Sequence, residues 1–476
     1  MNSPELNALL EKVENSIEVH GEHIHVTNAD ALRKNIDKLV EASSFGEGAS
    51  KFAARWLVRS AALELGAIPA SIQDLYMGRG RGEVPLTFTV PAINLRALAF
   101  DAAKAVFRVA GRINGAAILF ELARSEMSYT EQRPSEYATN IMAAAIAEGY
   151  EGPVFIQGDH FQVSPSRYEA DAESELQAVR DLTKEALEAG FYNIDVDTST
   201  LVDISKEDVK DQQILNTTLS AMFTKYIRDN EPDGVTVSVG GEIGEVGTEN
   251  STEEELRAYT DGFNAELAKL DADAVGLSKI SIQTGTSHGG TVLPDGSVAE
   301  VAVDFERMKQ LSQIARLEYG TAGAVQHGAS TLPMEAFGKF VEYEACEVHL
   351  ATNFQNMLYD RLPDELYNEV KAYLDKNNSN ERKEGQTDEQ FYYKTRKRAI
   401  GAFKRHFWDL PADKKAEICQ AWEDQFTQLF DLLGIADTRQ YVEKHVTPVK
   451  VLPSFESYVA MAGEVVVEED TSDLAD

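Results

Sequence analysis

The sequence predicts an α/β fold, a (β/α)8 barrel of the TIM type with helical extensions at its N- and C-terminal ends. Between residues 84 and 355, eight short apolar runs alternate with amphipathic helical patterns, as parallel strands and their covering helices do. On either side of this region, helical patterns continue but the apolar runs stop. A doubly wound open sheet is the alternative, although the chain lacks the glycine-rich first turn of dinucleotide-binding sheets.

Residues 1–83 form the N-terminal extension, which is expected to be mostly helical. Apolar residues recur at three- and four-residue spacing in LNALLEKVENSI (6–17) and AARWLVRSAALELGAI (53–68). The extension ends at MGRGRGEVP (77–85), where three glycines and a proline indicate a loop. The barrel is therefore expected to span residues 84–355.

Eight apolar runs supply the expected strands of this barrel: LTFTVPAIN (86–94), AAILFELA (116–123), PVFIQGDH (153–160), YNIDVDTS (192–199), VTVSVGGEIG (235–244), SKISIQTGTSHG (278–289), GAVQHGAS (323–330) and CEVHLATN (346–353). The clearest helix between them, residues 173–190, ends at Gly190. Its spacing places five residues along one face: Leu176, Val179, Leu182, Thr183 and Leu187.

Residues 356–476 form the C-terminal extension. The polar run DKNNSNERKEGQTDEQ (375–390) is expected to be an exposed loop. Helical patterns follow at 392–410 and 416–434, and the acidic residues 464–476 are typical of a frayed tail.

The net charge of the chain is −34, from 45 basic and 79 acidic residues. Such a field repels phosphate backbones and anionic lipids, so binding to nucleic acids or membrane surfaces is not expected. The first residues lack the apolar core of a signal peptide, and nowhere do about 18 apolar residues follow one another. We expect a soluble, cytoplasmic protein. With only Cys346 and Cys419, a disulfide scaffold is excluded, although one isolated bridge is not.

Three histidines stand at the expected C-terminal ends of strands: His160 in QGDH, His288 in TGTSHGG and His327 in VQHGAS. Barrel enzymes place their catalytic groups at this end. Three neutral imidazoles that meet there can hold a divalent ion, zinc being the best match, and leave a coordination position for a substrate. The structural alternative is that each histidine only satisfies neighbouring backbone groups.

Carboxylates occupy the same expected rim. Asp159 precedes His160, Asp195 and Asp197 end the fourth run, and Glu242 ends the fifth. Acids around a cation can exchange protons, orient its histidine ligands or serve as alternative ligands. Structural roles in loops are the alternative for each of them.

Small residues follow two of the histidines, in HGG (288–290) and HGAS (327–330). Glycines let backbone amides approach an anion closely, and Ser330 adds a hydroxyl donor. An anionic substrate in so acidic a chain needs a local positive site, which a zinc ion and oriented amides would supply. Ordinary turn chemistry is the alternative.

In this order and spacing, six motifs resemble the metal-dependent class II ketose-bisphosphate aldolases: VPAIN (90–94), QGDH (157–160), IDVDTS (194–199), GGEIGEVG (240–247), GTSHGG (285–290) and VQHGAS (325–330). The resemblance implies a zinc-dependent aldolase. Such an enzyme cleaves or forms a carbon–carbon bond in a phosphorylated ketose of the fructose- or tagatose-bisphosphate type, through a metal-stabilised enediolate, and exchanges it with triose products. We also expect a homo-oligomer, a dimer.

The resemblance implies a role for each matching residue. Asp159 becomes the catalytic acid and base, and His160, His288 and His327 become the ligands of one zinc ion. Glu242 is the second catalytic candidate, either supporting the ligands or binding a displaced metal. Contacts to substrate and phosphate fall on Asn94, Asp197, Ser199, Gly289, Gly328, Ser330, His349 and Thr352.

The eighth run departs from the family's pattern. Where the family shows a segment like N-I-D-T-D-L-R, this chain has HLATNFQ (349–355), which keeps only the threonine. His349 replaces an asparagine that contacts the dihydroxyacetone portion, Ala351 replaces an acidic residue, and Gln355 replaces an arginine that reaches a distal phosphate. Fructose 1,6-bisphosphate is therefore expected to be a weaker substrate than another phosphorylated ketose.

Three other features have competing interpretations. Lys279 in the sixth run could act as a Schiff-base amine, but the three histidines would then be unexplained. The histidines of HGEHIH (20–25) lie outside the barrel and are expected to be exposed or structural. The basic residues between Lys394 and Arg405 are expected to form a solvated or intersubunit face, with a phosphate bound from a neighbouring subunit as the alternative.

The non-enzymatic alternative is a metal-free barrel that stabilises a partner aldolase subunit. It would account for the altered eighth run and for the long extensions, which loosely resemble tagatose-bisphosphate aldolase subunit proteins. It leaves the three histidines without a purpose. A redox barrel is disfavoured because the sequence contains no cofactor fingerprint.

Overall fold

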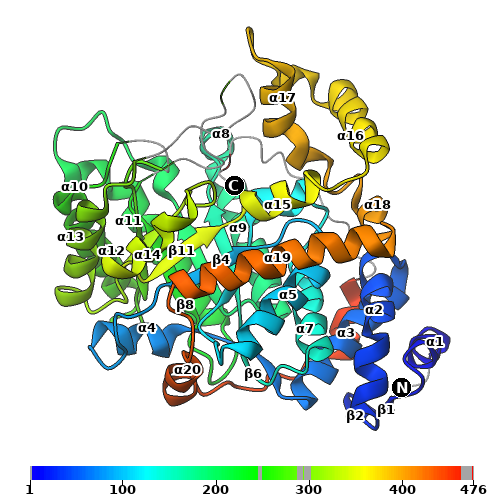
Figure 1. Cartoon of the computed structure of the whole chain (residues 1–476). Coiled ribbons are helices and arrows are strands. Elements are labelled where there is room, and N and C mark those ends of the chain that lie inside the picture. The colour runs from blue at the N-terminus through cyan, green and yellow to red at the C-terminus, as the bar shows by residue number, and fades with distance from the viewer. Residues whose placement is uncertain (1–2, 245–248, 287–292, 294–301, 462–473, 475–476) are drawn as a thin grey trace.

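The computed structural model describes residues 3–244, 249–286, 293, 302–461 and 474 of the chain. Its centre is a closed barrel of eight parallel strands, in which the last strand pairs with the first (Figure 1). This closure confirms the (β/α)8 fold and excludes the open sheet. The strands are β4 (Val90–Asn94), β5 (Leu119–Ala123), β6 (Gly152–Gln162), β7 (Asn193–Asp197), β8 (Ser238–Glu242), β9 (Lys279–Ile282), β10 (Ala324–Gln326) and β11 (Glu347–Leu350).

Helices cover the outside of this barrel. In α9, Asp171 caps the first turn by accepting a hydrogen bond from the Ser174 amide at 3.2 Å, and Gly190 ends the helix at a φ of 96°. The five residues predicted for its inner face are all buried. The covering helices are α5 (Ala99–Arg112), α6 (Arg124–Tyr129), α7 (Pro134–Ala147), α8 (Pro165–Ala170), α9 (Ala172–Ala189), η1 (Ser199–Leu201), α10 (Val209–Gln212), α11 (Ile214–Asn230), α12 (Glu253–Leu270), α13 (Phe305–Leu317), η2 (Met334–Ala336), α14 (Phe337–Glu342) and α15 (Thr352–Tyr359).

The N-terminal extension contains strands as well as the expected helices. The HGEHIH segment lies in an antiparallel hairpin whose turn includes Gly21 at a φ of 66°. A third strand, β3, pairs in parallel with the start of β6, and its four residues are all buried. The elements are α1 (Pro4–Lys12), β1 (Ile17–His20), β2 (His23–Val26), α2 (Ala29–Phe45), α3 (Gly48–Glu64), β3 (Ala67–Ala70) and α4 (Gln73–Gly80).

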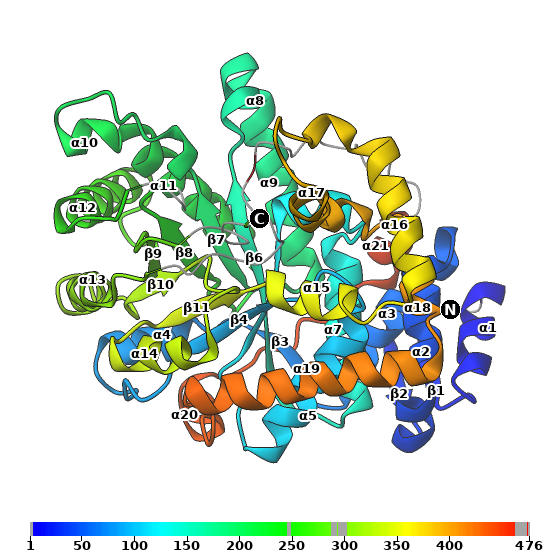
Figure 2. The same cartoon turned by 45° about the horizontal axis from the view of Figure 1, so that its top comes forward.

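The C-terminal extension packs against both the barrel and the N-terminal helices. Figure 2 shows α19 lying alongside α5 and α15. Trp422 on α19 donates from Nε1 to the Phe354 carbonyl at 3.0 Å, and Trp56 on α3 donates to the Pro453 carbonyl at 3.0 Å. Hydrogen bonds from buried indoles join segments distant in sequence.

Two predictions for the C-terminal extension were wrong in part. Residues 375–390 are not all loop, because α16 continues into them and α17 begins before they end. The helical pattern at 392–410 is interrupted after Thr395. The elements are α16 (Asp364–Asn377), η3 (Ser379–Glu381), α17 (Asp388–Thr395), η4 (Arg396–Ala399), α18 (Lys404–Trp408), α19 (Ala412–Leu432), α20 (Arg439–His445) and α21 (Phe455–Ala460).

Both cysteines are free thiols; Cys346 is buried and Cys419 is half-buried. Among the described residues, no helix combines the length and the apolar character needed to span a membrane.

Candidate functional site

A bulge in β6 places two consecutive residues, Asp159 and His160, in one cluster at the C-terminal end of the barrel. In a regular strand, consecutive side chains point to opposite faces. Here the pairing of β6 with β7 shifts register between Gly158 and Phe161, and His160 adopts a φ of 41°, which is uncommon outside glycine. A Cβ on Gly158 would lie 2.4 Å from the Phe161 ring, so the close approach beside the bulge requires glycine.

His160, Glu242 and His327 form the first group of metal-ligating side chains. All three are buried, and their ligand atoms lie within 4.8 Å of one another. Glu242 Oε1 is 3.2 Å from His327 Nε2 and 3.6 Å from His160 Nδ1. Among the described residues, this carboxylate oxygen accepts no hydrogen bond. Two imidazoles and a carboxylate are the donor set of a catalytic zinc site, so these residues fit a divalent ion.

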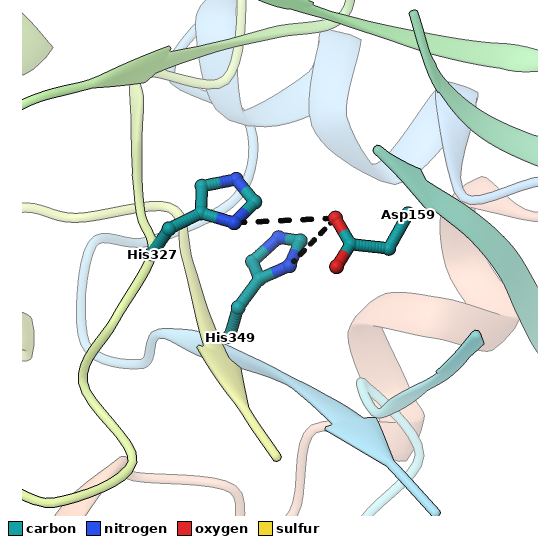
Figure 3. Close-up of side chains that lie close together, drawn as sticks. All are labelled: Asp159, His327 and His349. Atoms are coloured by element: carbon teal, nitrogen blue, oxygen red, sulfur yellow. Dashed lines mark ion pairs between the residues drawn. The ribbon is translucent and has the colours of Figure 1, made fainter. Parts of the chain in front are cut away.

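Asp159, His327 and His349 form a second group, drawn in Figure 3. Asp159 Oδ1 lies 3.3 Å from His349 Nδ1 and 3.9 Å from His327 Nδ1. The rings of His327 and His349 are 3.9 Å apart between centroids. His327 therefore belongs to both groups, and the Asp159 carboxylate lies beside the first.

Opposing effects set the pKa values of these groups. Burial raises the pKa of Asp159, but the charges of His160 and His349 outweigh it and hold that pKa well below its usual range. Burial raises the pKa of Glu242 to about 8, with His160 opposing. Burial and the neighbouring histidines lower the pKa of His327, which keeps its imidazole neutral. Asp159 is thus ionised at neutral pH, and His327 is in the form that binds metals.

Beneath the rim lies a layer of polar side chains that the sequence analysis did not single out as a set. Glu121, Gln157 and Glu347 join Asp195 and Lys279 there. Lys279 Nζ donates to Gln157 Oε1 at 2.8 Å and lies 2.9 Å from Asp195 Oδ1, and it also pairs with Glu347. The sequence did contain a signal for this layer: its members precede the rim residues by two positions, and residues two apart on a strand share a face. It relates Glu121, Gln157, Asp195 and Glu347 to the rim positions Ala123, Asp159, Asp197 and His349.

Lys279 is held as an ammonium ion. Burial alone would lower its pKa, but Asp195 and Glu347 outweigh burial and raise it above the usual value. A Schiff-base lysine must lose its proton before it attacks a carbonyl. The Lys279 environment therefore favours a structural counter-ion over that nucleophile.

Replacing Lys279 by methionine should destabilise the fold. Asp195 and Glu347 would remain buried without their cation, and breaking a buried pair costs about 3–5 kcal/mol. Denaturant unfolding monitored by circular dichroism measures the change. Lys269→Met, whose side chain is 67% exposed on α12, is the control and should change stability little. A loss no larger in Lys279→Met than in the control would contradict the counter-ion role.

Three residues predicted to contact the substrate form hydrogen bonds within the protein: Asp197, Ser199 and Asn94. Asp197 Oδ2 lies 2.9 Å from His160 Nδ1, and Asp197 Oδ1 accepts from the Ser199 hydroxyl at 2.7 Å. Asn94 Nδ2 donates to Glu126 at 2.6 Å. Asp197 and Ser199 are therefore placed to orient His160.

Four further predicted residues lie on β11 or after the ends of β10 and β11. Ser330 Oγ accepts from the Ala351 amide at 2.7 Å. Gly328 has a φ of 67°, which favours glycine, and Thr352 begins α15. Beside it, His349 Nδ1 contacts Glu121 at 2.8 Å and Nε2 contacts Glu347 at 2.6 Å. His288 and Gly289 lie outside the described residues.

Comparison with known families gives one match, a model described as fructose-bisphosphate aldolase class II, over residues 86–406. The fold is similar to that of a fructose-bisphosphate aldolase from Campylobacter jejuni, 16% identical with a TM-score of 0.46, covering 78% of this chain and 97% of that one. The YdjI aldolase from Escherichia coli K12 is 12% identical with a TM-score of 0.46, and the match covers 77% of this chain and 98% of that one. The fructuronate-tagaturonate epimerase UxaE from Cohnella laeviribosi is 13% identical with a TM-score of 0.51, and the match covers 73% of this chain and 81% of that one.

Proposed function

We propose, because the chain belongs to the class II fructose-bisphosphate aldolase family, that it is a zinc-dependent aldolase acting on a phosphorylated ketose. The observation that carries the proposal is the meeting of His160, Glu242 and His327 at the C-terminal end of the barrel, with Asp159 beside them. Enzymes of this family typically depend on a divalent metal, and this donor set suits one. A cytoplasmic location and a dimer stay predictions.

His160 and His327 would hold the ion, together with Glu242 or the predicted ligand His288. When bound, the ion supplies a positive charge that stabilises the enediolate left when the carbon–carbon bond breaks. Asp197 accepts from His160 and so fixes the orientation of that ring. The protein's own part is to hold these donors in a dry, rigid cluster.

Asp159 would act as the catalytic base in the cleavage direction. Its ionised carboxylate accepts the proton of the hydroxyl on the carbon that becomes an aldehyde, and in the reverse direction it returns that proton. His349 lies 3.3 Å from Asp159 and is itself held by Glu121 and Glu347. We therefore assign His349 a positioning role toward Asp159, in addition to the substrate contact predicted from the sequence.

The proximal phosphate would lie at the loops after β9, β10 and β11. Gly289, Gly328, Ser330 and Thr352 are the residues proposed to bind it. The Ser330 hydroxyl accepts from the Ala351 amide, which leaves its own proton for a phosphate oxygen. Asn94 is proposed to contact the substrate from the end of β4.

The decisive experiment is metal analysis of the purified protein, followed by retro-aldol assays whose products are identified by NMR. A stoichiometric divalent ion and triose products are the expected results. A metal-free protein without cleavage activity would favour the alternative of a non-catalytic subunit that stabilises a partner enzyme. Isomerised ketose in place of trioses would indicate an epimerase on the same scaffold and would overturn the aldolase assignment.

Substrate preference should reflect the altered eighth strand. We expect fructose 1,6-bisphosphate to be cleaved more slowly than tagatose 1,6-bisphosphate or fructose 1-phosphate, and unphosphorylated fructose more slowly still. A site built around a particular polar partner discriminates by orders of magnitude when that partner is missing. Comparison of kcat/KM across the four sugars measures this. Preferred turnover of fructose 1,6-bisphosphate would refute the altered specificity, and equal turnover of fructose would refute the phosphate site.

A further inference from the structure

The helix α4 of the N-terminal extension lies across the N-terminal opening of the barrel, at the end opposite the candidate site (Figure 1). Just before its first turn, the Ile72 amide donates to Asn193 Oδ1 at 2.8 Å, at the start of β7. In its last turn, Arg79 donates to the Ala345 carbonyl at 3.1 Å, two residues before β11. The strands β7 and β11 stand four positions apart in the ring of eight, so α4 crosses the opening from one side to the other.

Tyr76, in the middle of α4, reaches the interior of the barrel from this opening. The residue is buried, and its hydroxyl donates to Glu347 Oε2 on β11. Burial and the charge of Glu347 raise the pKa of Tyr76 well above its usual value. Burial would raise the pKa of Glu347 too, but Lys279 and His349 outweigh it and hold that pKa below its usual range. A neutral hydroxyl thus donates to an ionised carboxylate, which makes the hydrogen bond a charge-assisted one.

The same carboxylate contacts His349, which in turn contacts the proposed catalytic base. Glu347 Oε1 lies 2.6 Å from His349 Nε2, and His349 Nδ1 lies 3.3 Å from Asp159 Oδ1. An ionised carboxylate can only accept, so His349 Nε2 donates to Glu347. Tyr76, Glu347, His349 and Asp159 are each 4% exposed or less. A continuous buried chain of polar contacts therefore connects the N-terminal extension to the candidate site.

The two oxygens of Glu347 have different partners. Lys279, Gln157 and His349 contact Oε1, whereas Tyr76 donates to Oε2. A carboxylate held at both oxygens cannot turn about its last bond, so Oε1 stays directed toward His349. Without the tyrosine hydroxyl, Oε2 loses this donor in a buried place, and turning of the group or a stronger pull on His349 would compensate.

We propose that Tyr76 is a positioning residue of the reaction, which fixes Glu347 and through it holds His349 against the Asp159 carboxylate. For the reaction itself, this role rests on the proposed function. Tyr76 lies at the opposite end of the barrel from the substrate and acts only through Glu347 and His349. Residues at this end of a barrel usually serve stability alone, which is the competing role for Tyr76. The N-terminal extension thereby becomes part of the catalytic apparatus.

Tyr76→Phe, assayed as the metal-loaded enzyme, should lower kcat about fivefold and leave KM and metal content unchanged. Loss of an outer partner of a ligand costs about 10–100-fold, and Tyr76 acts through two intermediate residues, so a smaller effect is expected. Tyr150→Phe is the matched control, because the buried Tyr150 hydroxyl donates to the Pro153 carbonyl at 2.8 Å, near the start of β6. Parental kcat in Tyr76→Phe, or an equal fall in Tyr150→Phe, would overturn the proposal.

A double-mutant cycle distinguishes positioning from a general loss of stability. In a His349→Gln background, Tyr76→Phe should change kcat little, because the residue through which Tyr76 acts is already missing. The same fractional loss in both backgrounds would show that Tyr76 acts by another route and would contradict the proposal. Circular dichroism of each variant at the assay temperature ensures that only folded proteins are compared.

A spectroscopic signature of His349 tests the contact without turnover. In protein labelled with 15N-histidine, the proton that His349 Nε2 donates to Glu347 should give a downfield NMR resonance, assigned by its loss in His349→Gln. Tyr76→Phe should shift this resonance further downfield, because Glu347 without the tyrosine donor accepts more strongly from His349. Tyr150→Phe should leave it in place.

An unmoved resonance in Tyr76→Phe would show that Tyr76 does not hold His349 and would overturn the proposal. The NMR measurement also separates this proposal from the proposed function. If the wild type cleaves no ketose, the proposed function fails, whereas the resonance still decides whether Tyr76 acts on His349.

Discussion

His327→Ala should abolish stable binding of a divalent ion and, with it, carbon–carbon cleavage. His327 belongs to both groups of candidate ligands, and its neutral imidazole lies 3.2 Å from Glu242. Changes to residues that only support a ligand already reduce metal affinity by 10–100-fold, so loss of a ligand should exceed about 100-fold. Metal content after dialysis against a weak chelator, measured by elemental analysis, checks the first effect, and a retro-aldol assay checks the second.

His23→Ala is the control for this experiment, because His23 is exposed on the β1–β2 hairpin and lies outside the barrel. It should retain both metal and activity. Full metal content in His327→Ala would show that the cluster does not bind the ion. A metal site at the histidines of the β1–β2 hairpin would be supported only if His23→Ala lost its metal.

The same assay separates two ligand sets. The sequence motif predicts His160, His288 and His327, whereas the described structure brings Glu242 together with His160 and His327. His288→Ala and Glu242→Gln should therefore differ. Greater metal loss in His288→Ala would support the set predicted from the sequence, and greater loss in Glu242→Gln would make Glu242 the third ligand.

Asp159→Asn should retain the metal but slow cleavage by about 10²–10⁴-fold, the usual contribution of a positioned acid or base. The amide keeps the size of the side chain but cannot accept the hydroxyl proton. The carboxylate of Asp159 is ionised in the folded protein because His160 and His349 hold its pKa low, so the wild type has this base ready at neutral pH. Stopped assays of triose release under saturating ketose measure kcat.

Metal content measured on the same sample distinguishes this effect from loss of the ion. His349→Gln is the companion variant. If His349 only positions Asp159, kcat should fall more than KM rises, and the fall should be smaller than in Asp159→Asn. Parental kcat in metal-loaded Asp159→Asn would show that another group moves the proton.

The barrel could be predicted from the sequence because its evidence is local. Seven of the eight expected strands contain an observed one and the third lies within β6, since a buried parallel strand is a short continuous apolar run. The positions of Asp159, His160 and His327 followed from the same fact, because residues at the C-terminal ends of parallel strands meet at one rim. Gly190 likewise marked the end of α9, where its φ of 96° suits glycine.

The extensions were harder to predict. The strand β3 is four residues long and is stabilised by pairing with β6, some 85 residues later in the chain, which no local pattern records. The break in the helical pattern after Thr395 places Arg396 against Tyr359 and Asn356, contacts that only the packed chain contains.

The sequence by itself determined the barrel, its polarity and the rim positions of Asp159, His160 and His327, because short-range hydrophobic patterning specifies strands and the chain direction specifies which ends meet. The tertiary structure alone decided which of those residues act together. Closure of the barrel brings Lys279 to Glu347, a bulge beside Gly158 turns Asp159 and His160 into one cluster, and docking of η4 brings Lys397 to Tyr129. These contacts join segments far apart in sequence, and their geometry depends on register and packing that no local pattern encodes.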